Sequence, residues 1–380
     1  MANLLFCDSF DHFHLANLGQ KWGGTFTTIS ASIDAGRTVR AFRTVFNVVG
    51  NVAAGGITTI GAFRTSAITG IGSQQMGIGD PGAQCAALYF NTDGTCFVRD
   101  STYALKGIST KVAIEGGVGH YIELALSGLG IVVRVDGEII LNVAGDTTGD
   151  KTKFFIGGTG GGNFTYYEDL YVADGFMDDV IIEAIYPNGA GNYSQWTPLA
   201  GANYTNVDEE LASGTDYNGS STISQIDTFT FEDVSFSGVI KGIQLVVYVS
   251  YGLTGSSIRG ICRIAGTDYV HADTLSGTNQ AIFHRFCWTI SPATGIAWTQ
   301  AELNAAEFGY RHEDTNLMYV IQTVVEVVEV RDAVARISQV VLEASGINLS
   351  SARVSQALVE LLIETDVCTC PDTSSSNIMY

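Results

Sequence analysis

The sequence has few prolines and few charged residues for its length. Among 380 residues there are 5 prolines and 15% charged residues, against 44 glycines and many Thr, Ser, Val and Ile. Stretches with the 3.6-residue amphipathic period of a surface helix are almost absent, which excludes a mainly helical protein. The composition is typical of an all-β protein with many tight turns, and the length allows two or three domains.

Basic residues are also scarce. The 19 Lys and Arg face 39 Asp and Glu, which gives a formal net charge of −20. This charge disfavours binding to nucleic acid or to an anionic membrane surface. No apolar run reaches the roughly 18–20 residues that span a bilayer, and residues 1–8 lack the basic region of a signal peptide. We therefore expect no membrane insertion, and folding in a reducing cytoplasm.

Motifs of known enzymes are missing as well. The sequence contains no Gly-x-Ser-x-Gly, no Gly-x-x-x-x-Gly-Lys and no His-Glu-x-x-His. We therefore predict that the chain is not an enzyme, has no catalytic residues and needs no cofactor. The seven cysteines are an odd number. Five lie in apolar runs, where small buried hydrophobic residues are expected, whereas the role of Cys368 and Cys370 stays open between an inert pair, a metal ligand and a crosslink.

Carboxylates are the only material for a ligand site. Glu168, Asp169 and Asp174 follow Tyr167 in a strand-like stretch, but the Glu-x-Asp-x-Glu pattern of sandwich-fold glucanases is absent. We take Tyr167, Glu168, Asp169 and Asp174 as candidate ligand-binding residues, with Ca²⁺ as the candidate ion and a solvated acidic face as the alternative.

Aromatic residues are concentrated between residues 166 and 204. Their rings are either packing at a domain junction or a platform for sugar rings. The residues concerned are Tyr166, Tyr167, Tyr171, Phe176, Tyr186, Tyr193, Trp196 and Tyr204.

Turn signals divide the chain into strand-rich blocks. The clearest hairpin is residues 131–141, two apolar strands joined at Asp136-Gly137. We predict a concanavalin-like β-sandwich over residues 1–186 and a second, jelly-roll-like sandwich over 187–330. Residues 186–193, with Pro, Asn and Gly, are the expected linker, and residues 299–306 the expected helix, because Thr299 and Glu302 form a capping box.

The last sixty residues repeat with a period of seventeen. Residues 320–326 return as 337–343 and 354–360, and each copy is a β-branched run of strand length. We predict three strands that complete a sheet or β-prism with other subunits, in a homotrimer or in a neighbouring protein, with a small sheet folded back on the second sandwich as the alternative. The candidate assembly residues recur at fixed positions in the three copies: Gln322, Gln339 and Gln356, and Glu326, Glu343 and Glu360. Repeat strands and a polar tail thus make up residues 331–380.

Four stretches have a recognisable sequence: residues 8–13 with Lys21-Trp22, residues 167–174, the junction 176–198 and residues 335–343. They resemble virion proteins of tailed bacteriophages whose N-terminal domain is a concanavalin-type lectin/glucanase sandwich. The resemblance implies a structural or receptor-contacting component of the virion, assembled in the host cytoplasm, and it implies no catalytic residues.

The leading hypothesis is therefore a non-enzymatic virion protein that mediates assembly and host-surface contact. It would be tail-associated or fibre-associated, or a decoration of the head surface. The alternatives are a carbohydrate-binding receptor module and a polysaccharide depolymerase. Its partners would be further copies of itself, other virion proteins and a host-surface glycan.

Overall fold

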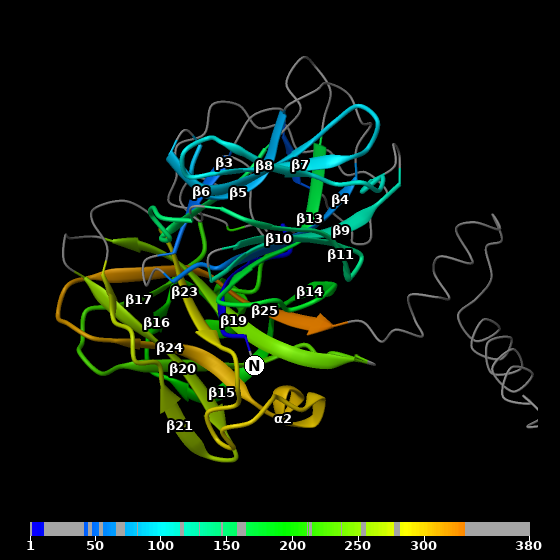
Figure 1. Cartoon of the computed structure of the whole chain (residues 1–380). Helices are drawn as coiled ribbons and strands as arrows, with labels where there is room; N and C mark the ends of the chain where they lie inside the picture. Colours follow the sequence, from blue (N-terminus) through cyan, green and yellow to red (C-terminus); the bar gives the residue numbers. More distant parts are fainter. Residues whose placement is uncertain are drawn as a thin grey trace, which may run out of the picture. The chain divides into compact units, whose positions relative to one another are not determined.

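The structure is a computed structural model. It describes residues 2–10, 42–44, 48–52, 56–65, 73–81, 83–114, 118–128, 130–145, 147–157, 165–210, 212, 215–236, 238–251, 256–276 and 282–330. These residues form four antiparallel sheets with two short helical segments, so the predicted all-β class is confirmed (Figure 1). No helix in this part of the chain is long and apolar enough to cross a membrane.

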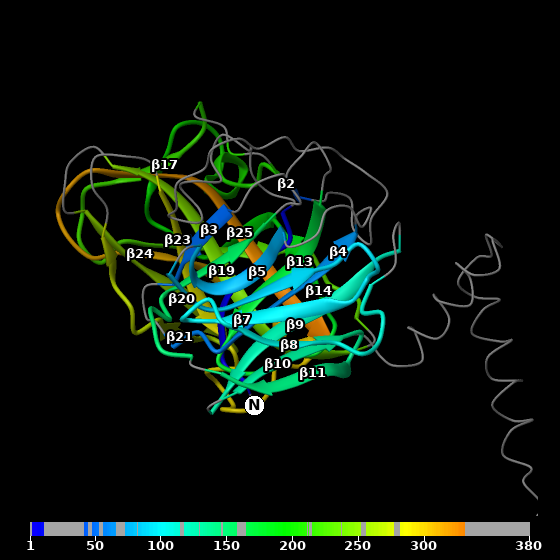
Figure 2. The ribbon, with the colours of Figure 1, turned by 45° about the horizontal axis from the view of Figure 1, so that its top comes forward.

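The first sandwich consists of two facing sheets (Figure 2). Sheet 1 runs in the order β1 (Leu4–Asp8), β13 (Thr165–Ala173), β4 (Thr59–Thr65), β9 (His120–Ser127), β10 (Gly130–Val135) and β11 (Glu138–Ala144), with β2 (Phe42–Thr44) also paired to β13. Sheet 2 runs in the order β3 (Val48–Asn51), β12 (Lys153–Ile156), β5 (Ser73–Asp80), β6 (Ala83–Phe90), β7 (Cys96–Asp100) and β8 (Leu105–Ile108).

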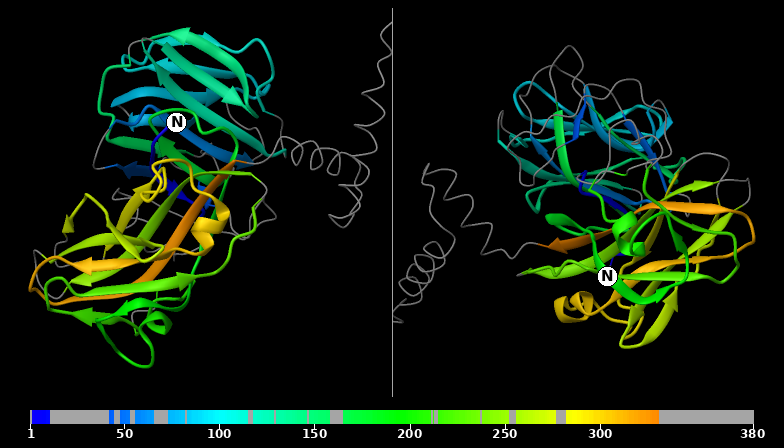
Figure 3. Two further views of the ribbon diagram at one scale, coloured as in Figure 1. Left: turned by 90° about the horizontal axis from the view of Figure 1, so that it is seen from below. Right: turned by 180° about the vertical axis from the view of Figure 1, so that it is seen from behind.

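The second sandwich is built in the same way (Figure 3). Sheet 3 runs in the order β16 (Thr197–Pro198), β17 (Asn218–Ser220), β25 (Met318–Val330), β19 (Val239–Tyr251) and β23 (Ile282–Trp288), and β14 (Val180–Ile185) also pairs with β25. Sheet 4 runs in the order β15 (Pro187–Ser194), β18 (Ile226–Phe231), β24 (Glu307–His312), β20 (Ser257–Ile264) and β21 (Thr267–Val270), with β22 (Leu275–Ser276) paired to β20. The helical segments are η2 (Asn203–Asn206) and α2 (Gln300–Asn304).

The hairpin turn at Asp136-Gly137 and the helix cap at Thr299, both predicted from the sequence, are present in the structure. Asp136 and Gly137 join β10 to β11 with φ angles of 51° and 84°, the two positive values that a type I′ hairpin turn requires. Helix α2 begins after Thr299, whose side chain accepts a hydrogen bond from the Glu302 N–H at 3.2 Å.

The predicted linker is wrong. Residues 187–194 form β15, which pairs with β18 at the edge of sheet 4. An edge strand tolerates proline and glycine because only one of its sides needs a complete set of backbone hydrogen bonds. Gly191 also has a packing reason, since a Cβ there would lie 2.6 Å from the backbone of Thr228.

The two sandwiches share part of their cores. The interior of the first sandwich, which includes Leu124 and Val98, is continuous with Tyr248, Phe283 and Val324 of sheet 3. Strand β14 lies before the predicted limit at residue 186, yet it forms its backbone ladder with β25 of the second sandwich. Residues 1–330 form one compact unit, and the domain limits at 186 and 330 stay predictions.

The first repeat copy, residues 320–326, lies within β25 in the middle of sheet 3. The second and third copies, at 337–343 and 354–360, lie outside the described residues, as do Cys368 and Cys370. The five other cysteines are free thiols, of which Cys7, Cys85, Cys96 and Cys262 are buried as predicted and Cys287 is half-buried.

Candidate functional site

Three of the four candidate ligand-binding residues, Tyr167, Glu168 and Asp169, are buried in β13. Tyr167 points into the first sandwich, where its hydroxyl lies 2.6 Å from the carbonyl oxygen of Gln75 and 2.8 Å from that of Gly157. Burial raises the pKa of Tyr167 to about 12. Glu168 is 1% exposed, so neither side chain is presented to a ligand from solvent.

The carboxylates of Asp169 and Asp174 accept hydrogen bonds from backbone N–H groups. Asp169 has a left-handed φ of 50°, and its Oδ1 accepts the Ile182 N–H at 2.9 Å. Asp174 accepts the backbone N–H of Asn3 at 2.6 Å and the Asn3 side-chain amide at 2.7 Å. Tyr167, Asp169 and Asp174 therefore serve separate structural contacts. No group of three His, Cys, Asp or Glu residues that could hold a metal ion occurs within the described ranges.

The assembly residues that the structure describes are used inside the chain. The Gln322 amide donates to the carbonyl oxygens of Glu209 and Glu210 at 2.7 and 3.0 Å. Glu326 accepts the Ser9 backbone N–H at 2.9 Å. The remaining four lie outside the described residues: Gln339, Gln356, Glu343 and Glu360.

The structure instead brings together four side chains, two on sheet 1 and two in the segment between β13 and β14. The Nη1 of Arg134, on β10, is 3.2 Å from Oε2 of Glu123, its cross-strand partner on β9. Its Nη2 donates to Oδ1 of Asp178 at 2.8 Å, and its guanidinium carbon lies 4.5 Å from the centre of the Phe176 ring. We call these four residues the Arg134 group. The Asp178 side chain is 43% exposed and that of Arg134 17%, so the group reaches solvent.

Buried residues hold the Arg134 group from behind. The Tyr171 hydroxyl donates a short hydrogen bond to Oε1 of Glu123, and the Asp178 N–H donates to the same oxygen at 3.1 Å. Burial raises the pKa of Glu123, whereas the bonds from Tyr171 and Arg134 act in the opposite direction. Asp178 has a φ of 69°, a conformation that costs about 1–3 kcal/mol and persists only where the surrounding structure enforces it. The guanidinium, the ring and the exposed carboxylate are therefore held in one arrangement.

A similar trio lies on sheet 4. Arg263 on β20 forms an ion pair with Asp268 on β21, and its guanidinium carbon lies 5.3 Å from the centre of the Tyr193 ring. The Tyr193 hydroxyl donates to Oδ2 of Asp268 at 2.8 Å, which raises the pKa of Tyr193. We call Arg263, Asp268 and Tyr193 the Arg263 group. Its carboxylate is occupied on both oxygens, whereas Oδ2 of Asp178 has no hydrogen bond from the described residues.

Five of the eight aromatic residues between 166 and 204 fall into two sets. Tyr167, Tyr171 and Trp196 are buried and belong to cores or to their edges. Phe176 and Tyr193 are only half-buried, and each lies under an arginine. The sequence analysis named both rings but missed their arginines. A usable signal was present, because Glu123 and Arg134 are lone opposite charges in adjacent apolar strands, a pattern that favours a cross-strand pair.

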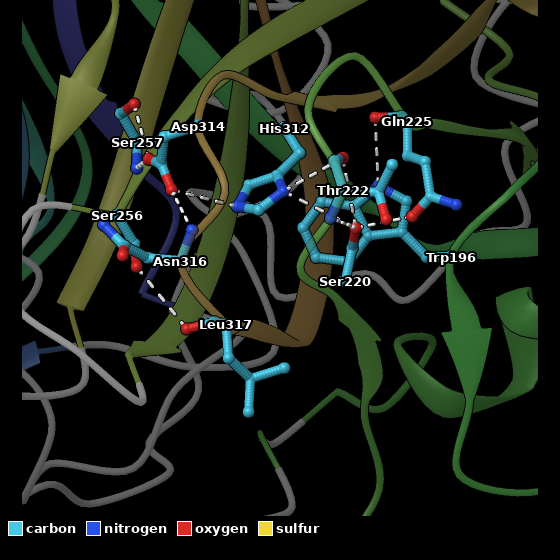
Figure 4. A network of polar contacts seen from close by, with 10 residues as sticks. All are labelled: Trp196, Ser220, Thr222, Gln225, Ser256, Ser257, His312, Asp314, Asn316 and Leu317. Atoms are coloured by element: carbon cyan, nitrogen blue, oxygen red, sulfur yellow. Dashed lines mark hydrogen bonds and ion pairs between the residues drawn. The ribbon is translucent and has the colours of Figure 1, made fainter.

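A serine, a histidine and an aspartate also lie in line at one end of the second sandwich (Figure 4). The Ser220 hydroxyl oxygen is 3.5 Å from Nδ1 of His312, and Nε2 of His312 is 3.6 Å from Oδ1 of Asp314. Both distances exceed those of good hydrogen bonds.

The shorter contacts give this group a structural role. Nδ1 of His312 lies 3.2 Å from the Thr222 carbonyl oxygen, to which it can only donate, and the Ser220 hydroxyl is 2.5 Å from Oε1 of Gln225. His312 is fully buried, with its ring against Trp196. The imidazole thus holds the turn after β17 against the end of β24.

Comparisons with known proteins give a distant fold likeness only. No family model and no curated protein matches the chain. Among solved structures, a Trypanosoma rangeli sialidase matches with 17% identity and a TM-score of 0.31, over 40% of this chain and 28% of the sialidase. Caenorhabditis elegans galectin LEC-6 matches with 11% identity and a TM-score of 0.27, over 34% of this chain and 94% of the galectin. The carbohydrate binding module CBM66 from Bacillus subtilis matches with 12% identity and a TM-score of 0.26, over 40% and 92% of the two chains.

This comparison corrects the prediction that the chain is not an enzyme. Sialidases are prominent among the matching structures, so a non-enzymatic nature no longer follows for a chain of this fold. The aligned region spans 28% of the sialidase chain and the TM-score is below 0.5, so the likeness assigns neither an activity nor a catalytic residue.

Proposed function

We propose that the protein binds glycans, and that the Arg134 group on the first sandwich is the binding face. The observation that carries this proposal is the fixed arrangement of Arg134, Phe176 and Asp178 at the protein surface. It deepens the carbohydrate-binding alternative that the aromatic residues suggested in the sequence.

The chemistry of a sugar matches such a group. A sugar ring has an apolar C–H face that can lie against an aromatic side chain, and hydroxyls that pair with planar, charged groups. Phe176 supplies the aromatic surface, and the exposed carboxylate of Asp178 supplies acceptors for hydroxyls. A small number of polar groups that converge beside an apolar surface is typical of small-molecule sites.

Glu123 and Tyr171 are positioning residues in this proposal. Glu123 is fully occupied by Tyr171, Arg134 and the Asp178 N–H, and both Glu123 and Tyr171 are buried. Their role is to keep Arg134 and Asp178 in place before the ligand arrives, which reduces the ordering cost of binding.

A glycan array with the purified full-length chain tests the proposal. We expect binding to a restricted set of glycans, and Asp178→Asn should weaken binding to each of them. The matched control is Asp268→Asn, which makes the same change in the Arg263 group and should leave binding unaltered. Absence of any glycan binding overturns the function, and loss of binding in Asp268→Asn alone moves the site to the second sandwich.

We also propose, as a second candidate, that the protein is a virion component of a tailed bacteriophage, present in several copies. The sequence resemblance at residues 8–13 and 167–174 supports this candidate. A glycan-binding face and a place on the particle surface are compatible, because such a protein would contact a host-surface glycan. Antibody labelling of intact particles in electron micrographs tests it, and purified particles without the chain would contradict it.

A further inference from the structure

Strand β1 is held on both of its edges, but among the residues that the structure describes only one edge is paired with a strand. On one side it pairs antiparallel with β13, with Cys7 opposite Tyr171 and Asp8 opposite Leu170. On the other side lies sheet 3, whose side chains take the place of a neighbouring strand.

These side chains bind the backbone of residues 4–9. Gln244 on β19 bonds both polar groups of Cys7: its Oε1 accepts the N–H at 3.2 Å and its Nε2 donates to the carbonyl oxygen at 2.9 Å. Glu326 on β25 accepts the Ser9 N–H at 2.9 Å, and Oγ1 of Thr289 accepts the Leu4 N–H at 2.9 Å. Main-chain bonds of this kind recognise an extended peptide, as in β-strand addition.

Side chains of β1 also pack closely in the space between β13 and sheet 3, which we call the β1 slot. Leu4 lies over Gly242 on β19, where a Cβ would come within 3.1 Å of the leucine. The Phe6 ring lies under the guanidinium of Arg285, 4.8 Å from its carbon, and packs on Phe154 at a centroid distance of 5.3 Å. Leu4 and Phe6 are 3% and 0% exposed. The slot therefore selects apolar residues at positions 4 and 6.

An empty slot would be unfavourable. Glu326 is buried and Arg285 is half-buried, with Asp8 and Glu326 among the groups that stabilise the charge of Arg285. Without β1, Glu326 loses the Ser9 N–H and Arg285 loses both Asp8 and the Phe6 ring. Buried charges that lose partners are costly, so the slot needs a strand at all times.

We propose that this slot is a strand-acceptor site, and that in an assembly its occupant is residues 2–9 of a second copy of the chain. The strand is joined to β2 by residues 11–41. At about 3.3 Å per residue such a connection can reach on the order of 100 Å, which allows β1 to enter its own slot or that of a neighbour. Exchange preserves every contact described above, which is the condition for domain swapping between identical subunits.

Photo-crosslinking in the full-length chain tests the proposal. Ala2 lies beside Gly175, where a Cβ would be 3.2 Å from the Ala2 Cβ, so a benzoylphenylalanine at position 2 reports on the occupied slot. Unlabelled and ¹⁵N-labelled chains that carry this residue are mixed, unfolded and refolded together, irradiated and digested. We expect linked peptides that join residue 2 of one label to residues 174–175 of the other, as frequent as pairs of one label.

Crosslinks within one label only would show that β1 stays in its own slot and would overturn the proposal. An absence of crosslinks to residues 174–175 would overturn it as well. Gly242→Val is the matched acceptor variant, because it fills the space of Leu4. It should reduce the crosslinks at least tenfold, whereas Gly145→Val, outside the slot, should not.

Discussion

Glu326 on β25 accepts the backbone N–H of Ser9 at 2.9 Å, across 317 residues of sequence. The same carboxylate accepts the side-chain amide of Gln244 at 2.6 Å. A residue that the 17-residue repeat marked for contacts between chains thus fixes the first strand to the second sandwich of its own chain.

Replacing Glu326 should therefore destabilise the fold. Glu326→Ala leaves the Ser9 N–H without its acceptor in a buried site and removes one of the two acceptors of the Gln244 amide, and we expect a loss of about 3 kcal/mol in the free energy of unfolding. Glu326→Gln keeps one acceptor oxygen and should lose less. Urea denaturation measures both, and an unchanged midpoint in Glu326→Ala would contradict the role given to this carboxylate.

Phe176→Ala should weaken glycan binding by about tenfold, equivalent to about 1.4 kcal/mol, because the sugar loses its aromatic surface. Titration calorimetry with a glycan that binds the unaltered chain measures the change. Tyr193→Ala removes the corresponding ring of the Arg263 group and is the control. Equal losses in both variants would mean that neither ring marks the site specifically.

Loss of the proton from Asp227 should make the folded state less stable as the pH rises from 4 to 7. Burial raises the pKa of Asp227 to about 6 from an ordinary value of 3.8, although bonds from Asn203, Trp196 and Gln195 oppose the shift. The folded state thus binds the proton more tightly than the unfolded state. The stabilisation is complete below the unfolded pKa and is lost as the pH rises through about 6, with a size of about 3 kcal/mol.

Thermal unfolding between pH 4 and pH 8 measures this dependence. Asp227→Asn removes the titrating group, so the variant should show a flatter profile than the unaltered chain, whatever its absolute stability. Parallel profiles of the two proteins would show that Asp227 does not titrate in this range.

Gly61→Ala should disturb the support of the Arg134 group. Gly61 lies on β4 under the Tyr171 ring, and an added Cβ would overlap that ring. Overpacking of this kind costs about 1–3 kcal/mol, and displacement of Tyr171 would also weaken its bond to Glu123. Gly145→Ala is the control, since its added Cβ meets only side chains at 3.2 Å or more. Equal unfolding midpoints for the two variants would contradict the tight contact.

Truncation after Val330 tests the predicted role of the repeats. If residues 331–364 hold subunits together, the shortened chain should lose its oligomeric state in sedimentation and keep the fold of residues 1–330. That part of the chain is one compact unit with its own cores. An unchanged oligomeric state would show that residues 331–364 do not hold the subunits together.

The sequence by itself determined the strands and the tight turns. A turn such as Asp136-Gly137 depends only on local backbone preferences, and the apolar, β-branched run of β10 favours a strand by its residue types. The cap at Thr299 is local in the same sense. These features were predicted because the residues that cause them are neighbours in the chain.

Tertiary structure alone decided which side chains meet. Pro187 and Gly191 have the composition of a linker, but hydrogen bonds to β18 make their segment a strand. Glu168 and Asp169 are a prominent acidic pair, yet burial and backbone contacts remove them from the surface. The Arg134 group and the β1 slot each depend on sheet order, which pairs β9 with β10 and sets β1 against sheet 3. Contacts between residues as distant as Ser9 and Glu326 follow from how whole sheets bury their apolar faces, and no local pattern encodes them.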